Sequence, residues 1–292
     1  MNNAAPDLIP LREQAITALA DAGVPDPQVD VDVMLAYFWG MSRGQVEAKV
    51  VTGSALPNEP ADALPRFLDA IARRAKREPL QHILGVAWFR SLELRVGPGV
   101  FVPRPETELL AEYAVEALRA QAVPEPIGID LGTGSGAIAL AMATEVPHAR
   151  IFAVEKSPEA AVWTRQNIAA YGDCVTLAEG DLADAFDELV GTVSVVATNP
   201  PYIPAAAIPR DVEVQLFDPA IALYGGEDGL DIVRVISGRA LELLVPGGLL
   251  IMEHGELQGQ QIRDILAADG WRAPQTLTDL THRDRYTRAT RP

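Results

Sequence analysis

An alternation that begins near residue 127 decides the fold class, because short apolar runs there alternate with longer segments of helical periodicity. Short apolar runs are typical of strands that are buried on both faces of a parallel sheet. Because a helix pattern follows most of these runs, the sequence predicts an α/β fold with a doubly wound, mainly parallel sheet. Strands are expected over Ile127–Leu131, Arg150–Val154, Val175–Glu179, Val193–Thr198, Gly248–Glu253, Thr276–Asp279 and Arg285–Thr290. Helices are expected over Gly136–Thr144, Pro158–Ala170, Gly229–Leu244 and Leu257–Ala268.

The residues before this region follow other patterns. Helices are expected over Leu11–Ala22, Val29–Trp39 and Leu64–Ala75. From Leu80 to Val102 the apolar spacing favours a β-hairpin with a turn at Arg90-Ser91, and a helix follows Pro103–Glu108. The sequence therefore predicts a helical domain over residues 1–77, a β-hairpin linker over 78–104 and the sheet domain over 105–292.

Charge and composition exclude several functional classes. A net charge of −16 over 292 residues repels a phosphate backbone, so direct contact with nucleic acid is not expected. The one cysteine, Cys174, excludes an intramolecular disulfide and is expected to be buried, and the four histidines lack the spacing of a metal site. The sequence shows no signal-peptide pattern and no apolar span of bilayer length. We therefore expect a cytoplasmic protein without membrane contact, and we expect it to act as a monomer.

A glycine-rich loop follows the first predicted strand of the sheet. Asp130 lies in that strand, and Gly132, Gly134 and Gly136 follow it with Thr133 between the first two. Glycines at this position let the backbone turn tightly and approach a ligand closely. The third glycine comes one residue earlier than in the dinucleotide-binding pattern, and an acid in the strand suits an amine-bearing ligand better than a pyrophosphate. The loop therefore predicts a nucleotide-like cofactor that carries an amine.

Two further acids follow the next two predicted strands. Glu155 lies about twenty residues past the loop, a spacing at which a carboxylate accepts hydrogen bonds from ribose hydroxyls. Asp181 follows the third strand and can accept from an adenine amine. Each element alone is weak, since a glycine triplet can be a plain turn and an acid at a strand end can be a helix cap. Together they fit S-adenosylmethionine, with its amine and carboxylate near the loop, its ribose on Glu155 and its adenine near Asp181.

The tetrapeptide Asn199-Pro200-Pro201-Tyr202 follows another buried strand, where open α/β sheets bind ligands. A planar amide or aromatic amine is a poor nucleophile because its lone pair is delocalised. The side-chain oxygen of Asn199 and the carbonyl of Pro200 can accept both of its N–H bonds, which orients the nitrogen towards a methyl donor. The prolines stiffen the turn, and Tyr202 can stack on the planar group. These residues predict methyl transfer to a planar nitrogen, with Asn199 also beside the cofactor.

Further motifs carry a resemblance to a known family. They are Pro79–Gly85, Val102–Glu108, the glycine loop, Asn199–Ile203, Phe217–Pro219, Leu223, Gly225-Gly226, Asp228–Leu230, Pro246–Gly248, Glu253 with Gly255, and Asp279-Leu280 with Arg283–Arg285. The sequence resembles the PrmC/HemK family, the glutamine methyltransferases that modify peptide-chain release factors. His82, His254 and His282 depart from the pattern, standing where tyrosine, isoleucine and glycine are expected.

The resemblance implies a Rossmann-like class I methyltransferase domain that uses S-adenosylmethionine. It also implies N-terminal helices that dock the release factor, and a target glutamine, methylated at N5, in the factor's Gly-Gly-Gln motif. Asn199, Pro200 and Tyr202 carry over as residues that hold the substrate. Gly132, Gly134, Glu155 and Asp181 carry over as cofactor contacts.

Several alternatives stay open at this stage. A glutamine methyltransferase that acts on a ribosomal protein, a DNA adenine methyltransferase and a non-catalytic binding module all share parts of the pattern. The segment Arg104–Glu108 either covers the cofactor or substrate loop or simply starts a helix with acids in its first turn. Likewise, Glu213–Gly229 is either a partner-contacting loop or an ordinary surface connection.

Overall fold

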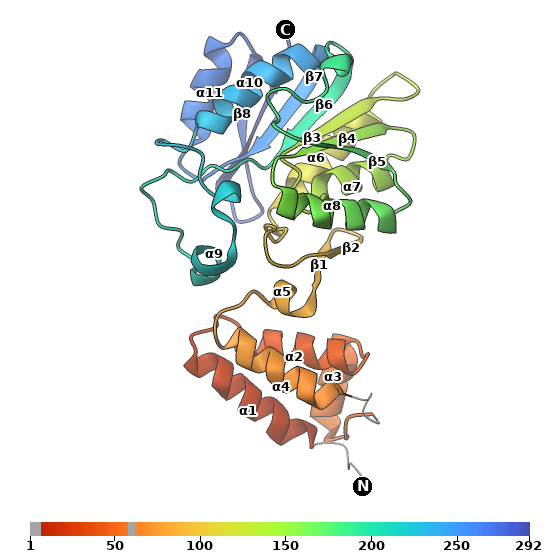
Figure 1. The fold of residues 1–292 in the computed structure, drawn as a ribbon, viewed down its shortest axis with the longest axis vertical. Helices are drawn as coiled ribbons and strands as arrows, with labels where there is room; N and C mark the ends of the chain where they lie inside the picture. The colour runs from red at the N-terminus through yellow and green to blue at the C-terminus, as the bar shows by residue number, and fades with distance from the viewer. Residues whose placement is uncertain (1–6, 58–61) are drawn as a thin grey trace. The chain divides into compact units, whose positions relative to one another are not determined.

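The computed structural model describes residues 7–57 and 62–292, and the chain forms two compact units (Figure 1). One unit comprises the residues up to Gly85 together with Arg210–Phe217. The other comprises Val86–Pro209 and Asp218–Pro292. The predicted domain boundaries at residues 77 and 104 stay predictions.

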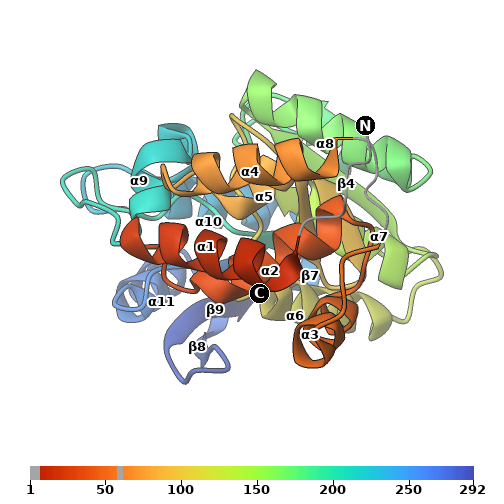
Figure 2. The ribbon, with the colours of Figure 1, turned by 90° about the horizontal axis from the view of Figure 1, so that it is seen from below.

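The first unit is helical. Its helices are α1 (Leu8–Asp21), α2 (Pro27–Phe38), α3 (Arg43–Thr52), α4 (Ala63–Arg74), α5 (Leu80–Leu84) and α9 (Val212–Phe217). Figure 2 shows α1, α2 and α4 side by side, and these three helices contact one another. Helix α4 buries Phe67 and Ile71 among others on one face, and the Trp39 ring meets the Phe67 ring edge-on at 5.8 Å between centroids. An apolar stripe at helical spacing therefore holds this unit together.

Two helices of this unit differ from the sequence prediction. Helix α3 was not predicted, because Val46 is its only buried residue and its periodicity is weak. Its start is set instead by a capping box, in which Ser42 and Gln45 exchange side-chain and backbone hydrogen bonds. Residues Leu80–Leu84 form α5 rather than the beginning of the hairpin, and His82 is buried within it.

A cluster of ion pairs joins α9 to the other helices of its unit. Glu213 accepts hydrogen bonds from Arg74 at 3.0 Å and from Arg77 at 2.8 and 2.7 Å. Arg74 also bonds Asp30 at 2.6 Å. Burial opposes the ionisation of Glu213, but the hydrogen bonds from the two arginines outweigh it and lower the Glu213 pKa to about 2. Residues Arg210–Phe217 are thus held to the other helices of this unit by charge.

The second unit contains a seven-stranded sheet of order β5-β4-β3-β6-β7-β9-β8. Its strands are β3 (Ile127–Leu131), β4 (Arg150–Glu155), β5 (Val175–Glu179), β6 (Val193–Thr198), β7 (Leu244–Glu253), β8 (Arg272–Thr278) and β9 (Asp284–Thr290). The first five are parallel, while β9 pairs antiparallel with both β7 and β8. The strand order reverses direction between β3 and β6, which creates a switch point where such sheets bind ligands. The predicted α/β, doubly wound fold is confirmed.

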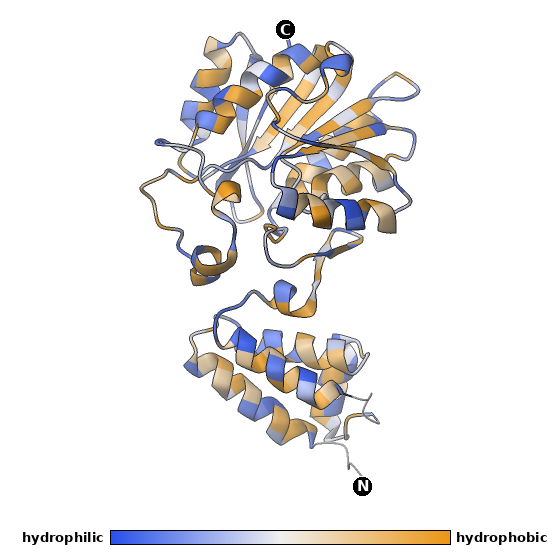
Figure 3. Cartoon of the chain, viewed as in Figure 1, coloured by the Kyte–Doolittle hydropathy of each residue, from blue (hydrophilic) through white to orange (hydrophobic). Residues whose placement is uncertain are grey.

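Helices cover both faces of this sheet. One core lies beneath α6 (Thr107–Arg119), α7 (Ala137–Glu145) and α8 (Pro158–Ala170), and the other beneath α10 (Asp231–Leu243) and α11 (Gly259–Ala268). Strand β4 alternates between them, because Ile151 and Ala153 face the first core while Phe152 and Val154 face the second. Figure 3 shows the apolar strands between these layers. Burial on both faces explains why these strands lack polar alternation in the sequence.

The predicted bounds of β3, β5, β6 and α8 are confirmed, whereas some others shift. Strand β7 begins at Leu244 instead of Gly248, because Leu244 already pairs with Val193 of β6. The register then shifts before Leu249 pairs with Val195. The hairpin strands β1 (Val86–Phe89) and β2 (Leu92–Arg95) pair around the predicted turn. Cys174 is exposed, so the prediction that it is buried is wrong; it lies in the turn before β5. Within the described ranges, no helix combines the length and apolar character needed to cross a membrane.

Candidate functional site

The glycine loop leaves β3 in a conformation that favours glycine. Gly132 and Gly134 have φ angles of +75° and +57°, and a Cβ atom built on either would meet no heavy atom within 4 Å. The backbone N–H groups of Gly132 and Thr133 both donate to the carbonyl oxygen of Val154 at 3.0 Å. Neighbouring strand β4 thus holds the start of the loop, while the side of the loop that bears no side chains stays open to an approaching ligand.

The carboxylate of Asp130 stabilises this loop through hydrogen bonds. Its Oδ2 atom accepts from the Thr133 hydroxyl at 2.6 Å and from the Ala139 backbone N–H in α7 at 3.1 Å. Its Oδ1 atom is buried and has no hydrogen-bond partner among the described residues. Burial raises the Asp130 pKa to about 7 against the opposing effect of these hydrogen bonds. A buried carboxylate oxygen without a partner is costly, and a ligand that carries an amine would relieve that cost.

Glu155 and Asp181 lie at the ends of the next two strands. Glu155 is buried, and its carboxylate accepts from the Gly134 N–H at 2.8 Å and from the Ser157 N–H at 2.7 Å. Asp181 is exposed, accepts from Ala183 N–H, and forms a 2.8 Å ion pair with Lys156, whose hydrogen bond lowers the Asp181 pKa. The predicted cofactor residues therefore share the carboxyl edge of β3, β4 and β5.

The tetrapeptide Asn199–Tyr202 follows β6 at the same edge of the sheet. The Thr198 hydroxyl donates to the Leu131 carbonyl at 2.6 Å, which ties the end of β6 to the end of β3. Beyond the tetrapeptide, the Ile203 N–H donates to Leu223 O at 2.8 Å, and the Gly225 N–H donates back to Ile203 O at 3.0 Å. A Cβ atom on Gly225 would overlap the carbonyl oxygen of Pro201. The turn is therefore packed backbone against backbone with the segment that precedes α10.

Gln258 holds the backbone of Tyr202. Gln258 donates from its side-chain Nε2 to the Tyr202 carbonyl at 2.9 Å, and its Oε1 accepts from the Gly255 N–H at 2.9 Å. Burial of the phenol, followed by the nearby carboxylate of Glu253, raises the Tyr202 pKa. The phenol therefore stays neutral at physiological pH.

The side chain of Asn199 is bound within the protein by its nitrogen. Its Nδ2 atom donates to the Thr107 hydroxyl oxygen at 3.2 Å, and the Thr107 hydroxyl donates to Glu253 Oε2 at 2.8 Å. Burial raises the Glu253 pKa to about 7, while the Thr107 hydrogen bond and the charge of Arg285 act in the opposite direction. Thr107 and Glu253 were not among the predicted site residues. Glu253 carries a signal that could have found it, because it is an acid that ends a buried strand next to β6.

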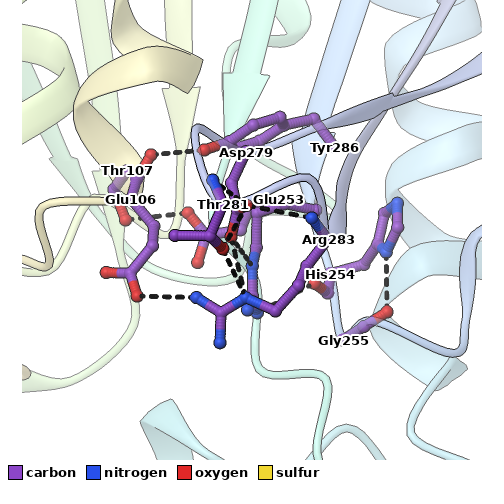
Figure 4. A network of polar contacts seen from close by, with 10 residues as sticks. Glu106, Thr107, Glu253, His254, Gly255, Asp279, Thr281, Arg283 and Tyr286 are labelled. Atoms are coloured by element: carbon purple, nitrogen blue, oxygen red, sulfur yellow. Dashed lines mark hydrogen bonds and ion pairs between the residues drawn. The ribbon is translucent and has the colours of Figure 1, made fainter.

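Figure 4 shows the polar network around Thr107 and Glu253. The Tyr286 hydroxyl donates to Glu106 O at 2.5 Å, and Arg283 forms ion pairs with Glu106 at 3.8 Å and with Asp279 at 3.2 Å. The turn between β8 and β9 thus holds the start of α6 beside the tetrapeptide.

The three histidines that depart from the family pattern lie in different settings. His82 lies in α5 of the helical unit. His254 is buried, bonds Gly255 O at 2.8 Å and Thr287 Oγ1 at 2.9 Å, and has a lowered pKa because of burial. His282 has a φ angle of +64°, the left-handed conformation that the expected glycine adopts readily. Neither His254 nor His282 contacts Asn199 or Glu155 through a hydrogen bond in the described part of the chain.

Two family models match parts of this chain. Residues 11–85 match the family model described as the PrmC N-terminal domain, and residues 93–226 match the methyltransferase small domain. The chain is 47% identical over 278 residues to a release factor glutamine methyltransferase of Streptomyces coelicolor, covering 94% of this chain and 95% of that protein. It is also 36% identical over 273 residues to a 4-amino-L-phenylalanine/4-methylamino-L-phenylalanine methyltransferase of Streptomyces pristinaespiralis, covering 93% and 90%.

Among solved structures, the chain resembles the Thermus thermophilus 16S rRNA N2 G1207 methyltransferase in complex with AdoMet and guanosine. The TM-score is 0.51 at 20% identity, and the match covers 71% of this chain and 50% of that one. This likeness shows the fold, whereas the sequence relatives extend over nearly the whole chain. The chain belongs to the family of the release factor glutamine methyltransferases.

Proposed function

We propose that this protein transfers a methyl group from S-adenosylmethionine to the side-chain amide nitrogen N5 of the glutamine in the Gly-Gly-Gln motif of peptide-chain release factors, in the cytoplasm. The relatives that match over most of the chain support the substrate class. The observation that carries the chemistry is the orientation of Asn199, whose Nδ2 is bound to Thr107. Its Oδ1 is thereby turned away from Thr107, and we infer that it accepts an incoming N–H.

The residues of the turn orient the glutamine amide. Asn199 Oδ1 and the Pro200 carbonyl accept its two N–H bonds, which directs the nitrogen lone pair and favours positive charge on that nitrogen. Pro200 and Pro201 contribute no N–H that competes for these acceptors. Tyr202 packs its neutral ring on the planar amide. A general base is unnecessary before attack, since the proton leaves after the methyl group has been transferred.

The cofactor site fits S-adenosylmethionine, which supplies an electrophilic methyl group when bound. The unpartnered Oδ1 of Asp130 suits its amine, and the open side of Gly132 and Gly134 lets the backbone approach its carboxylate end. Glu155 would accept from the ribose hydroxyls while it keeps its bond to the Gly134 N–H. Asp181 would accept from the adenine amine after exchanging its contact with Lys156.

One relative supports a second candidate substrate, an aromatic amine of the 4-aminophenylalanine type. Such an amine is also planar and also needs two acceptors for its N–H groups. The release-factor relatives are preferred because the first of them is 47% identical to this chain against 36% for the aromatic amine enzyme. Duplex DNA is disfavoured by the net charge of −16.

The test is methyl transfer from labelled S-adenosylmethionine to a purified release factor. Three parallel reactions replace this factor as the substrate. One contains the factor with its motif glutamine changed to alanine, another contains 4-aminophenylalanine, and the third contains duplex DNA. The site of label in the protein is located by peptide mass spectrometry. Label on the motif glutamine alone is the expected result. Label that persists on the Gln→Ala factor, or appears only on the amine or on DNA, would overturn the proposal.

A further inference from the structure

We propose that Thr107 and Glu253 act as positioning residues that set the amide orientation of Asn199, so that its oxygen and not its nitrogen faces the substrate. This inference rests on the proposed function of Asn199 as an acceptor for the substrate N–H. It gives a role to the segment Arg104–Glu108, whose place in the site was left open by its sequence.

The orientation of this amide matters because its two ends have nearly the same shape and opposite polarity. A half-turn about the last side-chain bond exchanges the oxygen, an acceptor, with the NH2 group, a donor. With the NH2 group forward, Asn199 would meet the substrate N–H with another donor and would repel it. An amide that the protein fixes in one orientation avoids this mismatch when the substrate binds.

A hydroxyl group selects the orientation only if its own proton is already committed. Thr107 has one such proton, and it is donated to Glu253 Oε2 at 2.8 Å. An ionised carboxylate can only accept, so the Thr107 oxygen is left with lone pairs for its other neighbour. The neighbour is Asn199 Nδ2 at 3.2 Å. Donation therefore runs in one direction, from Asn199 to Thr107 and from Thr107 to Glu253.

The anchors of this chain of hydrogen bonds are buried. Thr107 is 4% exposed and Glu253 is 3% exposed, and they lie at the start of α6 and at the end of β7. The residue before Thr107 is held by the Tyr286 hydroxyl, as Figure 4 shows. Thr107 is the first residue of α6, and its hydroxyl is directed to Glu253 at the end of β7.

Kinetics separate this role from a purely structural one. Thr107→Val removes the hydroxyl at nearly constant volume, and Thr107→Ser restores it. We expect Thr107→Val to lower kcat by about 10- to 100-fold, the scale for losing an outer-shell hydrogen-bond partner. The dissociation constant of S-adenosylmethionine should be unchanged, and Thr107→Ser should recover most of kcat. In an Asn199→Ala background, Thr107→Val should cause no further loss, because it acts only through Asn199.

A matched control removes a threonine hydroxyl at the other end of β6, far from Asn199. The Thr192 hydroxyl donates to Leu189 O at 2.7 Å just before the opposite end of β6, and Thr192→Val should leave kcat unchanged. The inference is overturned if the loss from Thr107→Val is as large in the Asn199→Ala background as in the wild type. It is also overturned if kcat falls only in parallel with the urea midpoint of unfolding.

A measurement without substrate distinguishes failure of this inference from failure of the proposed function. The side-chain NH2 resonances of Asn199 are assigned in 15N-labelled protein by their loss in Asn199→Ala. We expect Thr107→Val to shift them and to speed their exchange with water, and Thr107→Ser to restore both. Resonances that do not respond to Thr107→Val would overturn the inference even if the wild-type enzyme methylates release factors. If the resonances respond to Thr107→Val but the wild-type enzyme methylates no release factor, only the proposed substrate is contradicted.

Discussion

The backbone N–H of Gly134 donates a 2.8 Å hydrogen bond to the Oε2 atom of Glu155, which joins the glycine loop after β3 to the residue that ends β4. Both oxygens of this carboxylate are engaged by backbone N–H groups, the other from Ser157 at 2.7 Å. The carboxylate is therefore already oriented before any ligand arrives. An oriented acceptor gains more from binding a ribose than a mobile one, because less entropy is lost.

Glu155→Ala should consequently weaken binding of S-adenosylmethionine by about 1.5–3 kcal/mol, the range for hydrogen bonds to a charged group. Isothermal titration calorimetry measures this change in the dissociation constant. An Ala variant that binds the cofactor as tightly as the wild type would remove Glu155 from the ribose role.

Asn199→Ala should lower kcat by roughly 100-fold or more, the scale of losing one preorganised polar group. The dissociation constant of S-adenosylmethionine should barely change, because the loop and Glu155 are intact. Steady-state methylation of a release factor together with calorimetry separates the two effects. An equal loss of cofactor binding and turnover would contradict the assignment of Asn199 to the substrate.

Turnover should also depend on the protonation of Glu253, whose pKa burial raises to about 7. The groups that face it are Arg285, Glu106, the Tyr202 hydroxyl and the Thr107 hydroxyl. When pH falls through about 7, the carboxyl gains a proton and can donate to Thr107, which frees the Thr107 proton to bond the oxygen of Asn199 instead. We therefore expect kcat to fall as pH decreases through this range.

The pH profile of kcat for Glu253→Gln provides the comparison. Glutamine cannot gain a proton in this range, so the acidic limb that Glu253 causes should disappear from its profile. The profile of Thr192→Val, at the far end of β6, should match that of the wild type. A limb that is equally steep in Glu253→Gln would assign the pH dependence to another group.

Parts of this molecule follow from sequence for reasons that can be named. All six residues of β6 are buried, so the bounds of the apolar run in the sequence coincide with the bounds of the strand. The tetrapeptide was expected at the sheet edge because ligand sites in open α/β sheets follow the carboxyl ends of strands. Helix α3 was missed because a helix that buries only Val46 has almost no periodicity to detect.

The connection of Asn199 to Thr107 and Glu253 could not be predicted in the same way. Thr107 lies 92 residues before Asn199 and 146 residues before Glu253. No periodic or local pattern links positions that far apart, since their contact depends on the sheet order that sets β7 beside β6 and on the packing of α6 against both. The threonine at the start of a proline-led helix therefore had an ordinary explanation until the sheet was assembled.

Gly225→Ala should disable the catalytic turn without touching a side chain of the site. A Cβ atom at Gly225 would overlap the Pro201 carbonyl oxygen and lie 2.7 Å from the Gly229 carbonyl oxygen. Both obstacles are backbone atoms, so the turn that carries Asn199 must move. Because a displacement of about 1 Å can cost 100-fold in rate, we expect kcat to fall by about that factor. Binding of S-adenosylmethionine should be nearly unchanged.

Gly238→Ala is the matched control for the added methyl group. Gly238 is exposed within α10, and a Cβ atom there would meet nothing within 4 Å. Alanine favours a helix interior over glycine by about 0.5–1 kcal/mol, so this variant should raise the free energy of unfolding while kcat stays at the wild-type value. If Gly225→Ala turned over release factor as fast as Gly238→Ala, the packing of Pro201 against Gly225 would not determine the position of the turn.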